Sequence, residues 1–170
     1  MTQLPVPLVL VAALVLVPAA AASSTEHLSP DRLAAHADRV VRARVIRQQQ
    51  VERRDALGNL RTVSTLEVQE VLMGPPVKTL ELVQLGGRRG TEQSGVPGDA
   101  QVSRGDEAVW FLRCRDPEAP TRCTLVGHAA GQLRWNPRTG QAEAHRRGST
   151  PRAYRIEELR ALISEGRGGR

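Results

Sequence analysis

Apolar residues that alternate with polar ones predict a series of short strands along most of this chain. The pattern is clearest over residues 41–45, where valine and alanine alternate with arginine, as in a half-buried strand. The same alternation predicts further strands at 62–72, 79–82, 124–128, 132–135 and 142–145. By contrast, every residue of 108–112 is apolar, so we expect this segment to be the central strand, buried on both faces.

Two helices are predicted, one before and one after the strands. Ser29 followed by Pro30 is typical of a helix cap and a first helical residue, and we expect this short helix to extend to about Asp38. Apolar residues recur at helical spacing over 156–163, with charged residues on the opposite face. This pattern predicts an amphipathic helix that ends at Gly166.

Two segments interrupt the alternating pattern. The apolar and polar positions change phase at Glu70 and Val71, which indicates a β-bulge or the end of a strand. Residues 86–105 contain several glycines and no periodic apolar pattern, so they are predicted to form a long loop. Long loops inside a compact domain are usually functional or mobile, so this loop is a candidate wall for a site.

The fold class follows from the number and order of these elements. Strands outnumber helices and are joined by short turns, which favours a mainly antiparallel sheet that curls into a small barrel. A length of 170 residues fits one domain. We predict four segments: a signal peptide at 1–22, a leader with the short helix at 23–38, the β-barrel at 39–147, and a C-terminal helix and tail at 148–170.

The first 22 residues have the pattern of a secretory signal peptide. No charged side chain occurs between Leu4 and Ala22, and the apolar run ends in alanines that match an A-x-A cleavage site. The alternative is an uncleaved anchor, but the apolar core is shorter than the roughly 20 residues of a membrane-spanning helix and is interrupted by proline. We expect cleavage after Ala22, a secreted or periplasmic location, and no stable membrane span in the cleaved protein.

The two cysteines of the chain agree with export. Cys114 and Cys123 flank a short proline-containing segment between two apolar runs, which predicts a β-hairpin with a disulfide at its mouth. The alternative is a metal pair completed by His128, but zinc usually requires three or four protein ligands. We therefore expect a structural disulfide and no metal or cofactor.

Four segments of the predicted barrel resemble a loose group of uncharacterised exported bacterial proteins. The segments are 38–45, 66–74, 96–98 and 105–112, which read DRVVRARV, LEVQEVLMG, VPG and GDEAVWFL. The resemblance covers about residues 38–140 and implies a barrel similar to the OB-fold or to netrin-like modules. It departs at Ala43, where the group has glycine, and at Met73, where it has lysine. The group has no established activity, so no residue role is transferred.

Positive charge is concentrated in one part of the sequence. The chain has 24 Lys+Arg against 18 Asp+Glu and a formal net charge of +6. Residues 134–155 hold six arginines and one acidic residue, and a glycine-rich pair of arginines lies further upstream. The candidate anion-binding residues are Arg88, Arg89, Arg134, Arg138, Arg146, Arg147, Arg152 and Arg155. The alternatives are a solvated turn at 88–89 and arginines that only keep the protein soluble.

Composition and motifs narrow the function further. Aromatic residues make up 2% of the chain, which disfavours a stacking surface for nucleic acid or sugar. The sequence has no recognised catalytic motif, and its four histidines have no metal-ligand spacing. We therefore expect a non-catalytic binding or accessory module, with anionic envelope polymers or an exported protein as partner. Two alternatives are an exported hydrolase with a site between the 86–105 loop and the barrel, and an inhibitor or escort of an exported protease.

The signal-peptide assignment makes a direct prediction about the mature protein. Exported protein should begin near Ser23 and contain no free thiol, because the leader is removed and both cysteines are oxidised. Intact mass spectrometry with and without alkylation measures both properties. A retained leader or two alkylated thiols would show the assignment to be wrong.

Overall fold

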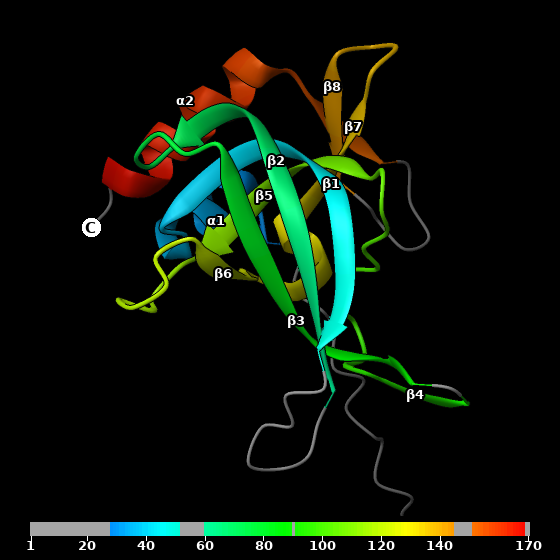
Figure 1. Cartoon of the computed structure of the whole chain (residues 1–170). Helices are drawn as coiled ribbons and strands as arrows, with labels where there is room; N and C mark the ends of the chain where they lie inside the picture. The colour runs from blue at the N-terminus through cyan, green and yellow to red at the C-terminus, as the bar shows by residue number, and fades with distance from the viewer. Residues whose placement is uncertain (1–27, 52–59, 90, 145–150, 169–170) are drawn as a thin grey trace, which may run out of the picture.

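The computed structural model describes residues 28–51, 60–89, 91–144 and 151–168 (Figure 1). Its elements in chain order are α1 (Pro30–His36), β1 (Arg39–Val51), β2 (Arg61–Met73), β3 (Thr79–Arg89), β4 (Glu92–Gly95), β5 (Glu107–Arg113), β6 (Arg122–Leu125), the 3-10 helix η1 (His128–Gly131), β7 (Gln132–Asn136), β8 (Gln141–Ala144), β9 (Arg152–Tyr154) and α2 (Ile156–Gly168). Strands therefore form most of the chain between two helices, as predicted.

Five of the strands close into a barrel. β1 pairs with β2, β2 with β3, β3 with β6 and β6 with β5, and β5 returns to pair with β1. Every pair in this ring is antiparallel except β3–β6, which is parallel and joins only Glu81 to Arg122 and Leu82 to Cys123. The predicted fold class is confirmed: a mainly β, OB-like barrel with a short N-terminal helix and a C-terminal helix.

β1 and β2 bend around the barrel because their pairing contains bulges. Each strand is 13 residues long, and their register shifts between Val40 and Val41 and again between Arg42 and Ala43. The residues paired between these two shifts are Glu70 and Val71, where the sequence pattern changes phase. The predicted irregularity is thus confirmed as bulges, which bend a strand and increase its twist.

β5 is buried on both faces, so it takes part in two separate hydrophobic clusters. Trp110 and Leu112 point into the barrel, whereas Val109 and Phe111 point to the layer between the barrel wall and the two helices. The indole Nε1 of Trp110 donates a hydrogen bond of 2.9 Å to the carbonyl oxygen of Ala43. The expectation that 108–112 is the central strand is confirmed, because β5 pairs with β1, β6 and β7.

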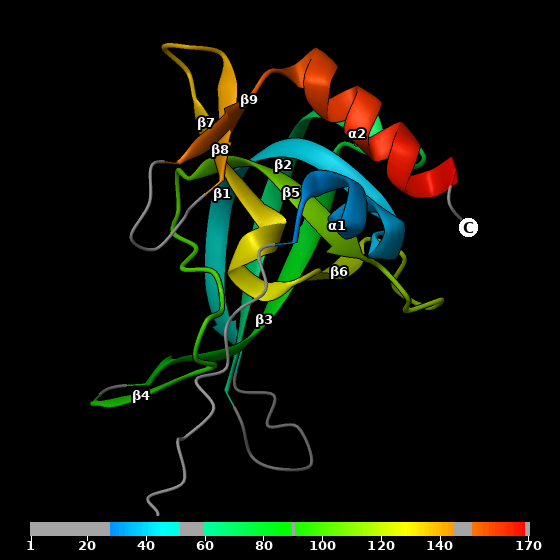
Figure 2. The ribbon, with the colours of Figure 1, turned by 180° about the vertical axis from the view of Figure 1, so that it is seen from behind.

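α1 and α2 lie side by side against the barrel (Figure 2). α2 does not end at Gly166 as predicted but continues to Gly168. Gly166 instead lies where the two helices approach most closely, because a Cβ atom at this position would overlap the backbone of Asp31. This glycine allows a helix–helix contact and does not terminate a helix. Within the described residues, no helix is long and apolar enough to cross a membrane.

The prediction of one long loop over 86–105 is wrong for its first half. β3 extends to Arg89, and β4 folds back on it to form a hairpin that projects from the barrel (Figure 1). Gly86 has a φ of 101°, and a Cβ there would overlap the carbonyl oxygen of Ser94. Because these paired strands contain glycine where they contact each other, they carry no apolar alternation that could be recognised in the sequence.

The strand predicted at 124–128 ends earlier than expected. β6 stops at Leu125, because Gly127 and His128 have φ values of 67° and 54°, and η1 follows. This interruption separates β6 from β7, although both pair with the same edge of β5. β7 leaves the barrel with β8 and with β9, a strand that the sequence pattern does not predict.

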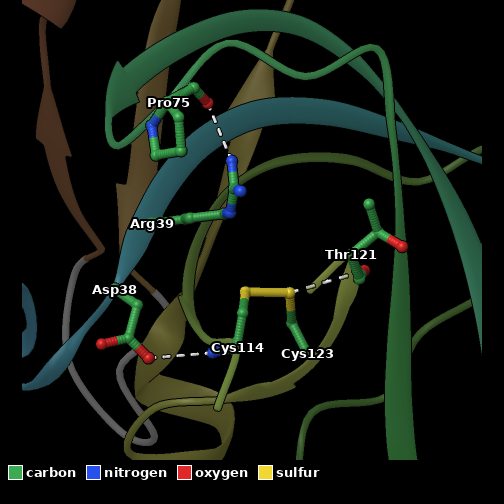
Figure 3. The surroundings of a disulfide bond; sticks show 6 residues. All are labelled: Asp38, Arg39, Pro75, Cys114, Thr121 and Cys123. Atoms are coloured by element: carbon green, nitrogen blue, oxygen red, sulfur yellow. Dashed lines mark hydrogen bonds between the residues drawn. A yellow bond between two sulfur atoms is a disulfide. The ribbon is translucent and has the colours of Figure 1, made fainter. Parts of the chain in front are cut away.

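The predicted disulfide between Cys114 and Cys123 is present and links the end of β5 to β6 (Figure 3). Cys123 is 1% exposed and lies opposite Leu82 in the short β3–β6 pairing. The carboxylate of Asp38 accepts a hydrogen bond of 2.9 Å from the backbone N–H of Cys114. The disulfide therefore holds the strand that closes the barrel.

Removal of the disulfide should destabilise the barrel at this junction. A Cys114→Ser/Cys123→Ser variant should lose about 2 to 3 kcal/mol of unfolding free energy, because the loop is no longer closed in the unfolded chain. Urea denaturation of the variant and of oxidised wild type measures this difference, and reduced wild type is the control. Equal midpoints for the variant and oxidised wild type would contradict the role of the disulfide.

Candidate functional site

A pocket of about 460 Å³ lies where β5 begins and β7 ends, and we call it the arginine pocket. Its lining residues are Arg44, Gly105, Asp106, Glu107, Arg134, Trp135 and Pro137. Three strands bring them together, since Arg44 is paired with Glu107 across β1–β5 and Arg134 with Ala108 across β5–β7. The pocket thus forms around the central strand from residues that are far apart in the sequence.

A network beside the arginine pocket is centred on Arg42. Its guanidinium donates to the carboxylates of Glu107 at 2.9 Å and of Glu70 at 3.4 Å. The same guanidinium lies 4.7 Å from the centre of the Trp135 ring, which is a cation–π contact. Arg160 of α2 also binds Glu70 at 2.8 Å, so the network joins the helix to the barrel. Trp135 is therefore held in place on one face by Arg42.

The arginine pocket is lined by two arginines and two carboxylates, and the carboxylates bind other groups of the protein. The carboxylate of Glu107 is bound by Arg42, and that of Asp106 accepts a hydrogen bond of 2.8 Å from the backbone N–H of Ser103. Arg44 and Arg134 are both exposed and have no ion-pair partner among the residues that the structure describes. Two guanidinium groups without an acidic partner among these residues therefore line the pocket, Arg44 from the face of Glu107 and Arg134 from the face of Ala108. Each has the planar, forked hydrogen-bonding geometry that suits an anion.

The structure disperses the other predicted anion-binding residues. Arg138 lies in the β7–β8 turn, and Arg155 is exposed between β9 and α2. Arg152 lies 4.9 Å from the Tyr154 ring and 3.6 Å from Glu158. Arg88 and Arg89 belong to the β3–β4 hairpin, and Arg146 and Arg147 lie outside the described residues.

Arg134 and Arg152 do not share a face of the β7–β8–β9 sheet. Glu143 of β8 is opposite Arg134 on one side and Ala153 on the other, whereas Ala144 is opposite Arg152. Because neighbouring residues of a strand point to opposite faces, the two arginines point away from each other. Arg134 belongs to the arginine pocket, and Arg152 belongs to the surface around Tyr154.

A second pocket, of about 550 Å³, lies at one end of the barrel, and we call it the barrel mouth. It is lined by Gln48, Thr62, 84–87 and 94–102. Here the barrel interior changes from apolar to polar, since Ser64 is fully buried and its Oγ accepts a hydrogen bond of 3.3 Å from Gln48. The barrel mouth is lined by residues of the barrel and of the predicted 86–105 loop, where the hydrolase alternative places its site.

Residues 96–102, which we call the strap, cross the barrel mouth. The side-chain amide of Gln84 donates to the carbonyl oxygen of Ala100 at 2.8 Å, and that of Gln48 donates to the carbonyl oxygen of Val102 at 2.8 Å. The side chain of Val102 packs on the apolar cluster inside the barrel. The strap is therefore held to β3 through Gln84 and to β1 through Gln48.

One histidine–acid pair lies near the barrel mouth. Nδ1 of His128 is 3.9 Å from Oδ1 of Asp99, and the side chain of His128 is 61% exposed. In the described residues no serine or cysteine side chain is hydrogen-bonded to His128, and no group of three or more metal-ligating residues occurs. His145, the other histidine considered for hydrolysis, lies outside the described residues. Hydrolysis therefore stays an untested alternative.

Sequence reasoning missed Arg42, Arg44 and Trp135 as parts of a site. The alternation over 41–45 does place both arginines on the outer face of β1. It does not indicate that β5 brings β7 and its tryptophan next to them, because the β1–β5 pairing joins residues 63 to 73 positions apart. Arg134 was predicted as an anion-binding residue, but from the number of arginines in 134–155 and not from this pocket.

The Arg42 network makes a testable prediction about stability. Replacing Arg42 by Met should lower the unfolding free energy by about 1 to 3 kcal/mol, because Glu107 and Glu70 lose a charged hydrogen-bond donor in a half-buried place. Urea denaturation measures the loss, and Arg44→Met is the matched control on the same strand, where we expect a change within about 0.5 kcal/mol. Equal stabilities of the two variants would exclude a stabilising role for the network.

No family model and no curated protein matches the chain. The closed five-stranded barrel is compatible with the OB-like fold that the sequence resemblance implies. The site must therefore be interpreted from its own residues.

Proposed function

We propose that this chain is an exported, non-catalytic binding module that captures anionic polymers of the cell envelope at the arginine pocket. One observation carries the proposal: both carboxylates in the pocket have partners within the protein, whereas Arg44 and Arg134 have none among the described residues. The ligand chemistry that suits two free guanidinium groups is a carboxylate or phosphate, each of which accepts paired hydrogen bonds.

The arrangement of the pocket supports a polymer as ligand. The pocket lies at the protein surface. Arg138 follows the lining residue Pro137 in the β7–β8 turn. A net charge of +6 attracts polyanions from a distance before specific contacts form. Because Arg42 and its two glutamates hold Trp135, the wall of the pocket is organised before a ligand arrives.

Three observations support export. The leader at 1–22 has the signal-peptide pattern, the disulfide fits an oxidising compartment, and the segments 38–45 and 105–112 resemble a group of exported bacterial proteins. We therefore propose a secreted or periplasmic location and membership of that group. Inhibition or escort of an exported protease stays a separate prediction, because no contact among the described residues tests it.

Anion binding is tested by removing the two free arginines. An Arg44→Gln/Arg134→Gln variant should bind fluorescent polyglutamate and polyphosphate about tenfold or more weakly than wild type, because two charge-assisted hydrogen bonds are lost. Fluorescence anisotropy at low and at physiological salt measures the affinity. Wild-type affinity should fall steeply with salt, since exposed charges are screened beyond about 8 Å at physiological ionic strength.

The control variant has the same total charge as the Arg44→Gln/Arg134→Gln variant. An Arg115→Gln/Arg167→Gln variant removes two exposed arginines from the β5–β6 loop and the end of α2, away from the pocket. It should bind both polyanions within about twofold of wild type. If both double variants lose the same affinity, the arginines act only through net charge, and the pocket is not the site.

A further inference from the structure

The barrel mouth differs in chemistry from the arginine pocket. Among the described residues that line it, none is lysine, arginine or aromatic, although the chain contains 24 Lys+Arg. Asp99 is the acidic residue of the described lining, and its carboxylate accepts hydrogen bonds from the backbone N–H of Ala100 at 2.9 Å and from Gln84 at 3.4 Å. A pocket of this composition does not favour anions and offers no ring on which a sugar or a base could stack.

The barrel mouth already binds a polypeptide main chain, namely its own strap. Gln84 of β3 and Gln48 of β1 donate to the carbonyl oxygens of Ala100 and Val102, which are two residues apart. Ala100 is buried and Gln101 exposed, so side chains along this segment alternate as in an extended strand. The two glutamines are thus arranged to recognise an extended main chain without regard to charge.

Space beside the strap remains for a second segment. The open volume of about 550 Å³ lies within the roughly 300–1,000 Å³ of ligand pockets. Gly95 and Gly98 border this space, and a Cβ atom on either would meet no atom within 4 Å. Leu85 lines the pocket and is 47% exposed, so it offers an apolar contact to a ligand side chain.

We propose that the barrel mouth binds a short, extended and uncharged peptide segment of another exported protein. The peptide lies alongside the strap, its amides form hydrogen bonds with the hydroxyl, amide and main-chain groups of the mouth, and one apolar side chain contacts Leu85. This site is separate from the arginine pocket and takes an uncharged ligand where that pocket takes an anion, so the protein has two recognition surfaces.

The probe follows the sequence of the strap at Ala100–Gln101–Val102. The capped hexapeptide acetyl-Ala-Gln-Val-Ala-Gln-Val-amide is titrated into the oxidised, ¹⁵N-labelled protein, and backbone amide shifts are followed by NMR. Saturable shifts at Gly86, Ser94 and Val96 support the proposal. The peptide with both glutamines replaced by glutamate should bind at least about fivefold more weakly, because the carboxylate of Asp99 lines the site and repels it.

Two variants, each with one exposed apolar residue replaced by aspartate, distinguish binding at the barrel mouth from binding elsewhere on the surface. Leu85→Asp should weaken binding of the uncharged peptide about tenfold or more, since it places a charge where the apolar contact forms. Ile46→Asp is the matched control, because Ile46 is 39% exposed on β1 and is not in the lining. It should leave the affinity within about twofold of wild type.

Other outcomes would overturn the proposal. It fails if the uncharged peptide produces no saturable shifts at the mouth, if Leu85→Asp and Ile46→Asp behave alike, or if chitotriose shifts the same amides and the peptide does not. The Arg44→Gln/Arg134→Gln variant should bind the peptide as wild type does. Failure of this proposal therefore leaves the test of anion binding unaffected, and the reverse also holds.

Discussion

β5 is the strand on which every other part of the structure depends, because all of its edges and faces are occupied. Along one edge it pairs with β1, and along the other with β6 and then β7. Its side chains supply Trp110 to the barrel interior and Phe111 to the layer beneath the helices. Both apolar clusters therefore contain residues of this strand. The two departures from a simple barrel also adjoin it: the interrupted β6–β7 edge and the outer β7–β8–β9 sheet. A single apolar segment thus organises two cores.

The same strand separates two surfaces of different polarity. Near its first residue, Glu107 binds Arg42 and leaves Arg44 and Arg134 without an acidic partner among the described residues. At the barrel mouth, Gln48 and Gln84 use neutral amides to hold the strap. These neutral side chains hold the strap without placing a charge in the contact, and an unpaired charge would be costly to bury. Arg44 and Arg134 are exposed, so water solvates their guanidinium groups.

The sequence predicted best the features that depend on local pattern. The apolar run 108–112, the Cys114–Cys123 hairpin and the helix after Ser29 each have a signal within a few residues, and all are present. The β3–β4 hairpin was missed because glycines at its contact leave no apolar alternation, and Gly166 was misread because a helix–helix contact selects glycine as well as a helix end does. The arginine pocket could not be predicted, because it needs the long-range pairing of β1, β5 and β7. Part of the predicted basic surface, Arg146 and Arg147, lies outside the described residues.

The seam between β3 and β6 has a consequence for when the protein folds. Only two residue pairs join these strands, and the disulfide is formed beside them. For a chain exported as proposed, the cysteines meet an oxidant only after they cross the membrane. Before that, the seam lacks its crosslink, and a loss of 2 to 3 kcal/mol shifts the balance toward the unfolded chain by about two orders of magnitude. A secretion channel that accepts unfolded chains would thus receive this protein before its barrel is stable. The barrel would then be completed after transport, when the disulfide forms in the oxidising compartment.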